Sequence, residues 1–282
     1  MKYAILISNL DNLDAYEDKI MIQKLFRSSI DFLNRLFDKE IEEKVEINSG
    51  DMSAVFKNTD TAFLYYRLLV VLLYPLKIKS GLSFGKINEL QKVLENALTA
   101  LNFCINNNYD IILGTEDETD KFLNMFFLMR TEMRSDPSIP ANLIQLFSEF
   151  LFPLKGDFSI LKRQDMIARL SLILKFKSDL YQYLIEYPDL VDLNINLERN
   201  KFPIIDYGKY IDYIQAVDLI QTDFSEDYQI LYNSFWKKGF STKVGEILGI
   251  TRQIVDRNYR YLNFAVLRNL DATITTFLKS KV

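Results

Sequence analysis

The chain has 282 residues and a formal net charge of −4 at pH 7, and 49% of its residues are hydrophobic, enough for substantial buried cores. It contains no histidine and one cysteine, which excludes a disulfide within the chain, a histidine-based metal site and a Ser-His or Cys-His nucleophilic pair. Catalysis would therefore have to rest on carboxylates, lysines, tyrosines or a carboxylate-bound Mg²⁺, and we expect no cofactor.

The first 115 residues alternate between strand and helix patterns. Residues 2–10 are apolar and partly β-branched, and from Ile20 apolar side chains recur with the 3.6-residue period of an amphipathic helix. Around residues 49–51 two short strands meet at a tight turn, as in a β-hairpin. The predicted elements, in chain order, are a strand over 2–10, a helix over 20–37, the hairpin, a helix over 59–73 capped by Thr59 or Asp60, a strand over 77–87, a helix over 89–106 and a strand over 109–114.

This order predicts an α+β fold, with an N-terminal ferredoxin-like or palm-type antiparallel sheet that carries helices on one face. The longest apolar run, residues 68–76, contains Pro75 and is far shorter than the ~20 residues that a transmembrane helix needs. The N-terminal strand lacks the small-residue cleavage site of a signal peptide. We therefore expect a cytoplasmic protein with no membrane partner, and we expect Cys104, which falls at core spacing, to be a buried structural thiol.

Beyond residue 116 the apolar spacing is helical throughout. The predicted helices cover 120–134, 141–153, 162–187, 208–221 and 226–238, followed by two short helices and a closing helix from Tyr259 or Leu262 to Leu278. We therefore expect three domains: a palm-like domain over 1–115, a helical connecting region over 116–222 and a helix-turn-helix domain over 223–282.

The segment from Ser241 to Leu262 has the pattern of a helix-turn-helix. Gly245 would let two short helices cross closely, Gly249 would leave the first helix in the left-handed conformation that glycine adopts without steric cost, and Thr251 would be the N-cap of the second helix. In this motif the second helix enters the major groove, so we expect double-stranded DNA as the partner. The small or apolar positions expected between the helices are Val244, Leu248, Ile250, Ile254, Val255 and Tyr259.

The second helix of the motif leaves one face polar. We expect Arg252, Gln253 and Arg257 to contact base edges, because guanidinium and amide groups make bidentate contacts with guanine and adenine. Asp256 lies on the same face. Phosphate contacts are expected from Lys237, Lys238, Lys243, Thr251 and Arg260. The alternative is an ordinary helical hairpin with a surface stripe of arginines.

The charge of the chain is unevenly distributed. From Lys237 to Val282 there are nine basic and three acidic residues, a net charge of +6, which leaves −10 for the rest. A basic segment on an acidic protein is the distribution expected when one end contacts phosphates. This charge coincides with the helix-turn-helix pattern and therefore favours DNA binding.

A single motif covers little DNA, so we expect a homodimer. The closing helix is the candidate contact, and packing of that helix within its own domain is the alternative. Its apolar residues are Phe264, Val266, Leu267, Leu270, Ile274, Phe277 and Leu278.

Five stretches together have a recognisable layout: YAILISNL, SGDMSAVF, KSGLSFGKI, NALTALNFCINNNYDIIL and KGFSTKVGEILGITRQIVDRN. This layout resembles the SatD-like family of bacterial proteins, which join a nucleotide-cyclase-like palm domain to a C-terminal helix-turn-helix. The last stretch is also similar to the DNA-binding unit of LuxR-type regulators and to the sigma-factor region that binds promoters. The resemblance implies a transcription regulator whose palm-like domain dimerises or senses a small-molecule or nucleotide ligand.

Active palm domains hold Mg²⁺ with one aspartate that closes the first strand and another in the hairpin. The resemblance places Asp51 at the hairpin position and Asn9 at the first-strand position, with Asp11 two residues further on. Asn9, Met52 and Ser53 depart from the family pattern, and a neutral amide is a poor Mg²⁺ ligand. These departures imply an incomplete metal site and favour a regulator over an enzyme.

Three alternatives stay open at this point. Asp51 with Asp11 would serve a Mg²⁺-dependent palm-type enzyme that binds nucleotides. The aromatic-rich helical middle would serve as a protein-interaction module. Gly50 and Asp51 would also be explained by the tight turn alone, because both residue types favour turns.

Overall fold

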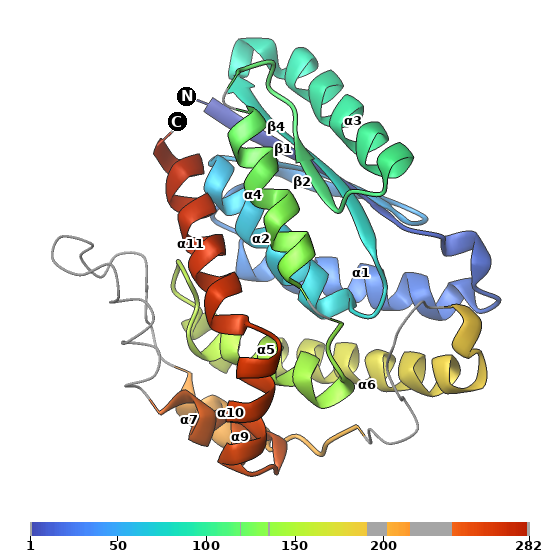
Figure 1. Ribbon diagram of the computed structural model, residues 1–282, viewed down its shortest axis with the longest axis vertical. Helices are drawn as coiled ribbons and strands as arrows, with labels where there is room; N and C mark the ends of the chain where they lie inside the picture. Colours follow the sequence, from blue (N-terminus) through green and yellow to red (C-terminus); the bar gives the residue numbers. More distant parts are fainter. Residues whose placement is uncertain (1, 119, 135, 191–201, 215–238, 281–282) are drawn as a thin grey trace, which may run out of the picture. The chain divides into compact units, whose positions relative to one another are not determined.

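The computed structural model describes residues 2–118, 120–134, 136–190, 202–214 and 239–280 (Figure 1). The chain forms two compact units, with Met1–Met133 and Thr273–Val282 in unit 1 and Arg134–Ala272 in unit 2. The predicted mixture of α and β structure is confirmed. The predicted domain boundaries, at residues 115 and 222, do not coincide with these units and stay a prediction. None of the described helices is both long and apolar enough to cross a membrane.

Within the described residues, unit 1 holds a five-stranded sheet with the order β2-β3-β1-β4-β5. Antiparallel pairing joins β1 to β3 and to β4, with Asn9 opposite Asp51 and Ile7 opposite Gly81, and β2 pairs antiparallel with β3. The predicted order of strand, helix, hairpin, helix and strand is confirmed. The strands are β1 (Lys2–Leu10), β2 (Ile41–Asn48), β3 (Asp51–Phe56), β4 (Ile78–Lys86) and β5 (Ile111–Leu113).

Helices α1 (Lys19–Leu36) and α2 (Thr59–Leu73) cover one face of the sheet (Figure 1). Every residue of α2 is buried. On this face Tyr65 packs its ring against Phe56 of β3, with 5.2 Å between the ring centroids. The N-cap of α2 is Asn58, so the predicted cap at Thr59 or Asp60 is wrong by one or two residues. The Asn58 side chain instead donates a hydrogen bond to Glu40, which ties the start of α2 to the loop before β2.

Helix α3 (Leu90–Asn107) covers the opposite face, where Ile5 and Ile7 pack against Ala97 (Figure 1). Strand β5 then runs parallel to β4. Two predictions are therefore wrong: the sheet is not fully antiparallel, and its helices do not lie on one face only. Both differences have the same cause, because parallel neighbours need a crossover connection and α3 makes that crossover on the free face.

The backbone of α3 lies directly against β4 at Gly81. A Cβ atom at this position would lie 2.0 Å from the carbonyl oxygen of Ala97 and 2.5 Å from the amide nitrogen of Leu101. Nearby, the buried thiol of Cys104 donates to the carbonyl of Ser80 at 3.0 Å, and burial raises its pKa to about 12. The prediction of a buried structural thiol at Cys104 is confirmed.

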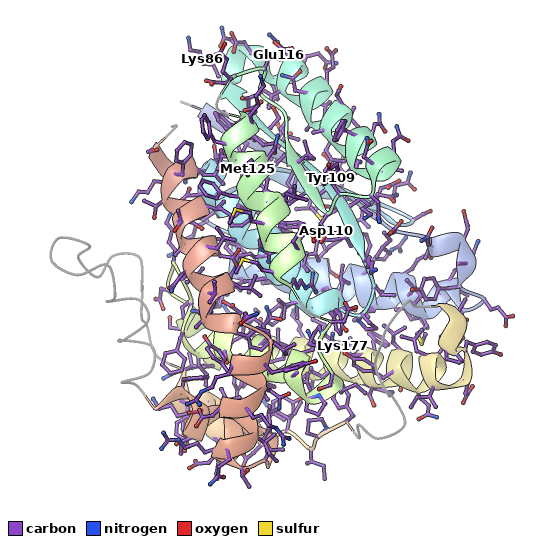
Figure 2. All side chains as sticks on the ribbon, viewed as in Figure 1. Lys86, Tyr109, Asp110, Glu116, Met125 and Lys177 are labelled. Carbon is purple, nitrogen blue, oxygen red and sulfur yellow. The ribbon has the colours of Figure 1, made fainter. Side chains whose placement is uncertain are left out.

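Helix α4 (Asp120–Met133) closes the free edge of β5. The side-chain amide of Asn124 accepts a hydrogen bond from the N–H of Leu113 at 2.8 Å and donates one to its carbonyl at 2.9 Å, as a neighbouring strand would. Phe127 and Arg130 face inward, over Phe63 and Tyr66 of α2. This leaves the opposite side of α4, which includes Met125, exposed to solvent (Figure 2).

Unit 2 is helical. Helix α5 packs against both α9 and α10, and α7 packs against α9. The predicted helix over 226–238 and the end of the one over 208–221 lie outside the described residues. The helices are α5 (Ile139–Leu151), α6 (Gln164–Glu186), α7 (Tyr207–Tyr213), α9 (Phe240–Leu248), α10 (Arg252–Tyr261) and α11 (Phe264–Ser280), whose residues from Thr273 onward belong to unit 1. Short 3-10 turns occur at Leu13–Ala15, Ile87–Glu89, Ser159–Lys162 and Pro188–Leu190.

The last helix starts later than expected. The predicted start at Tyr259 or Leu262 is wrong, because Asn263 adopts a left-handed conformation with φ of 52° and separates α10 from α11. Asparagine tolerates this conformation better than most residues.

We predict that Gly81→Ala lowers the free energy of unfolding by about 3 kcal/mol or more, because the added methyl group overlaps the backbone of α3. Ser83→Ala, on the same strand, is the matched control. The Ser83 hydroxyl is buried without a hydrogen-bond partner among the described residues, so its removal should leave stability unchanged or raise it. Urea unfolding of both variants measures this, and similar losses for the two would contradict the close contact.

Candidate nucleic-acid interface

Two short helices, α9 and α10, and the turn between them lie where the sequence predicts a helix-turn-helix. Gly249 ends α9 in the left-handed conformation, with φ of 62°, and Thr251 is the N-cap of α10, with its side-chain oxygen accepting from the N–H of Ile254 at 3.4 Å. A Cβ atom on Gly245 would lie 2.8 Å from the carbonyl oxygen of Ile250. The roles predicted for Gly245, Gly249 and Thr251 in the fold are therefore confirmed.

The inner side of α10 is anchored by aromatic packing. Val255 and Tyr259 are fully buried, and the ring of Tyr259 lies between those of Phe240 at 4.6 Å and Phe264 at 5.5 Å, measured between centroids. Phe240 begins α9 and Phe264 begins α11, so one side chain of α10 contacts the elements on both sides of it. This packing buries the inner side of α10 and helps to fix which face of the helix points outward.

Helix α7 supports α9 from its far side. The backbone N–H of Asp206 donates to the carbonyl of Ile247 at 2.8 Å. The hydroxyl of Tyr213 donates to the carboxylate of Glu246, and the Lys209 ammonium lies 3.6 Å from the same carboxylate. The hydrogen bond from Tyr213 and then the charge of Lys209 lower the pKa of Glu246. Glu246 therefore stays ionised and holds α7 against the motif.

The outer face of α10 carries the residues predicted to contact bases. Arg252, Gln253 and Arg257 are all exposed, and so is Arg260 further along the helix. Asp256 is more covered and accepts a hydrogen bond from Arg252 at 3.4 Å, one helical turn away. The structure therefore gathers these predicted residues on one surface and adds an internal ion pair between two of them.

The residues predicted to bind phosphates differ in their surroundings. Thr251 is exposed at the start of α10, where the first backbone N–H groups of the helix have no partner within the helix. The Lys243 ammonium instead lies over the rings of Phe152 and Tyr213, at 5.7 and 5.6 Å from their centroids. Lys237 and Lys238 lie outside the described residues.

One basic residue counted in the C-terminal charge is not at the surface. Arg268 of α11 is buried, where its guanidinium donates to the carboxylate of Glu149 and to the carbonyl of Phe152. Its charge is neutralised by Glu149 of α5, so the net charge of +6 overstates the charge at the surface of this segment. Tyr261, in contrast, is 75% exposed at the end of α10. The sequence did not predict this, because an aromatic residue in a helix is expected to be buried.

The residues of the expected palm-type metal site are engaged in other contacts. The side-chain amide of Asn9 donates to the carboxylate of Asp51 across the pair of β1 and β3. Asp11 lies on the β4 side of β1, where its N–H donates to the carbonyl of Lys77 and its carboxylate lies 3.9 Å from the buried ammonium of Lys79. The two aspartates are therefore held by groups on different sides of β1.

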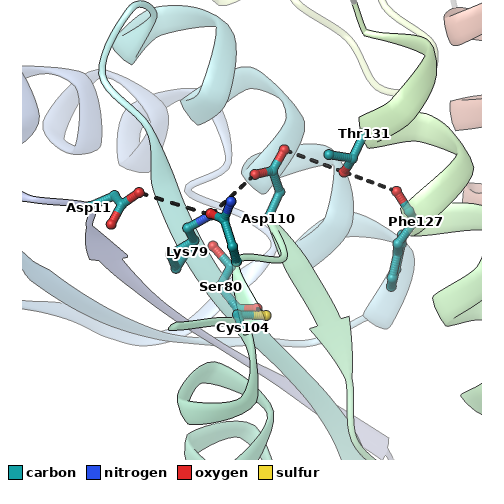
Figure 3. Close-up of polar contacts among 8 residues, drawn as sticks. Asp11, Lys79, Ser80, Cys104, Asp110, Phe127 and Thr131 are labelled. Carbon is teal, nitrogen blue, oxygen red and sulfur yellow. Dashed lines mark hydrogen bonds and ion pairs between the residues drawn. The ribbon is translucent and has the colours of Figure 1, made fainter. Parts of the chain in front are cut away.

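Lys79 is the centre of a polar cluster at one end of β4 (Figure 3). Besides Asp11, its ammonium contacts the side-chain oxygen of Asn108 at 2.7 Å and the carboxylate of Asp110 at 3.7 Å. The hydroxyl of Thr131 in turn donates to Asp110 at 3.3 Å. A cation already occupies the space in front of Asp11, which makes this carboxylate a poor substitute for the missing metal ligand.

Gly50 of the hairpin lies close to the side chain of Leu13. The left-handed residue in this turn is Ser49, with φ of 50°, and not Gly50. A Cβ atom on Gly50 would lie 2.9 Å from the Cδ2 atom of Leu13. This Cδ2 atom is the end of a flexible side chain that can move, so packing does not require a glycine here, and the explanation of Gly50 by the tight turn stays open.

Most apolar side chains of α11 are buried. Phe264, Leu267, Ile274 and Leu278 are buried, whereas Val266 is exposed. Ile274 and Leu278 lie in the part of α11 that belongs to unit 1, so the alternative expectation, that this helix packs within its own domain, stays a prediction. The expected homodimer needs a different surface and stays a prediction.

Comparison with known proteins finds no family model that matches the chain and no match among curated proteins.

We predict that Arg268→Met lowers the free energy of unfolding by about 3–5 kcal/mol, because the Glu149 carboxylate then stays buried without its guanidinium. Combining it with Glu149→Leu should recover part of that loss, since an apolar pair replaces two buried charges. Urea unfolding of the full chain measures both variants. Equal losses for the single and the double variant would contradict a buried ion pair.

Proposed function

We propose that this protein binds double-stranded DNA through α10 and acts as a transcription regulator. The observation that carries the proposal is the outer face of α10, where Arg252, Gln253 and Arg257 are exposed on a helix whose inner side is locked by Val255 and Tyr259. A left-handed glycine and a capped second helix occur at many helix ends, so they set the geometry of this pair of helices, and the proposal rests on the exposed arginine face. The major groove admits a helix presented in this way.

The contacts divide into two groups under this proposal. Arg252, Gln253 and Arg257 lie in the first two turns of α10, the part that contacts base edges in helix-turn-helix proteins. Thr251, the N-terminal backbone N–H groups and Arg260 would contact phosphates and set the register. Asp256 is proposed to orient Arg252 through their ion pair and to disfavour a phosphate at that position.

We further propose that unit 1 is a palm-like module that senses a ligand or mediates dimerisation, and that it is related to the SatD-like proteins. The order β2-β3-β1-β4 with its two helices, α1 and α2, supports a ferredoxin-like core. The residues present do not fit a two-Mg²⁺ site, because Asn9 occupies the first ligand position and Lys79 neutralises Asp11. This favours a sensing or structural role for unit 1 over nucleotide chemistry.

We predict that Arg252→Ala with Arg257→Ala weakens binding to a duplex, selected by the wild-type chain from a random pool, by about 100-fold or more. Each arginine is expected to contribute about 1–3 kcal/mol of base discrimination. Fluorescence anisotropy at fixed salt measures the dissociation constant.

The matched control is Arg27→Ala with Arg35→Ala, which removes the same charge from two exposed positions of α1. This control should bind the duplex within about twofold of the wild type, because α1 is not part of the proposed DNA contact. Equal weakening by the two double variants would show that general charge, and not α10, governs binding. Thermal unfolding of both variants checks that the fold is intact.

A further inference from the structure

The outer side of α4 is an exposed apolar face on unit 1. Phe122 is 66% exposed and Met125 is 63% exposed, and Leu128 and Met129 are exposed beside them. The spacing of these residues places them on one side of the helix. The other side of α4 packs inside unit 1, where Leu123 and Phe127 are buried and Asn124 hydrogen-bonds to β5. Four large apolar side chains on one short helix are more than scattered exposure requires.

One end of this face carries a positively charged residue and the other end a negatively charged one. Lys121 lies in the first turn of α4 and Glu132 in the last, and both are exposed. Lys121, Met125, Leu128 and Glu132 follow one another at spacings of four, three and four residues, which is the seam of a helix that pairs with another helix. Lys121 and Glu132 are equally far along the sequence from the midpoint between Met125 and Leu128.

We propose that α4 is the contact through which two copies of this chain dimerise, with the two α4 helices antiparallel about a two-fold axis at that midpoint. The symmetry places Met125 against the partner's Leu128 and Phe122 near the partner's Met129. It also places Lys121 against the partner's Glu132, twice in each dimer. A two-fold contact is self-complementary in this way when each surface carries both signs of charge.

The charges distinguish this arrangement from the parallel one. In a parallel pair each Lys121 would face the partner's Lys121 and each Glu132 the partner's Glu132, which repels at both ends. In the antiparallel pair both ends attract. The same face is a poor fit for nucleic acid, since its centre is apolar and its ends carry balanced charge. Dimerisation through α4 does not depend on DNA binding by α10, and it is measured without DNA.

Charge reversal on the full chain tests the arrangement. Lys121→Glu alone and Glu132→Lys alone each set like charges opposite one another, and each should raise the dimer dissociation constant by about tenfold or more at low salt. The variant with both changes restores opposite charges at both ends and should return to within about threefold of the wild type. Sedimentation equilibrium measures the dissociation constant.

The apolar centre is tested with Met125→Asp, which should raise the dissociation constant by about 100-fold or more, because it places a carboxylate in the middle of the contact. Leu98→Asp, at an exposed position of α3, is the matched control and should leave the dissociation constant unchanged. Circular dichroism and thermal unfolding check that each variant is folded.

Four results would overturn the proposal. The first is a wild-type chain that stays a monomer at every concentration. The second is a dimer that Met125→Asp leaves intact, and the third is equal weakening of the dimer by Leu98→Asp and Met125→Asp. The fourth is a double charge reversal that does not restore the dimer affinity lost in the single reversals.

Discussion

The position of α10 depends on one close backbone contact at the end of α9. The carbonyl of Gly245 accepts hydrogen bonds from the N–H groups of Gly249 and Ile250, and a Cβ atom at position 245 would come within 2.8 Å of the Ile250 carbonyl oxygen. Any side chain at residue 245 would push the turn away and rotate the helix that follows. The outward direction of Arg252 and Arg257 is therefore a consequence of this contact, together with the left-handed conformation of Gly249.

Parts of the chain far from the motif hold it in place. Helix α5 packs against α9 and α10, and its Glu149 pairs with Arg268 of α11, 119 residues later. The hydrogen bond from the N–H of Asp206 to the carbonyl of Ile247 also ties the start of α7 to α9. The motif is thus embedded in unit 2 and shares its core with the helical middle of the chain. A change in the packing of α5 would move the DNA-binding face, which gives unit 2 a direct means to control binding under the proposed function.

The elements governed by local sequence were predictable, and those governed by distant partners were not. Gly249 and Thr251 act through the local geometry of the helix ends, so their roles in the fold could be inferred from the sequence. The parallel pairing of β5 depends on where α3 crosses the sheet, for which no local signal exists. Arg268 and Lys243 looked like surface charges because sequence spacing does not reveal Glu149 or the rings of Phe152 and Tyr213. The outer face of α4 lies in the helical middle, for which a protein-interaction module was an open alternative, but helical spacing alone does not tell which of its apolar side chains face solvent.

Amide hydrogen exchange on the full chain, with and without a duplex that it has selected, tests the central claim most directly. If α10 lies in the major groove, exchange should slow at the turn and along the start of α10, from residue 250 to 257, while β1 and β3 of unit 1 exchange as before. Protection confined to unit 1, or duplex binding with no change at α10, would contradict the account.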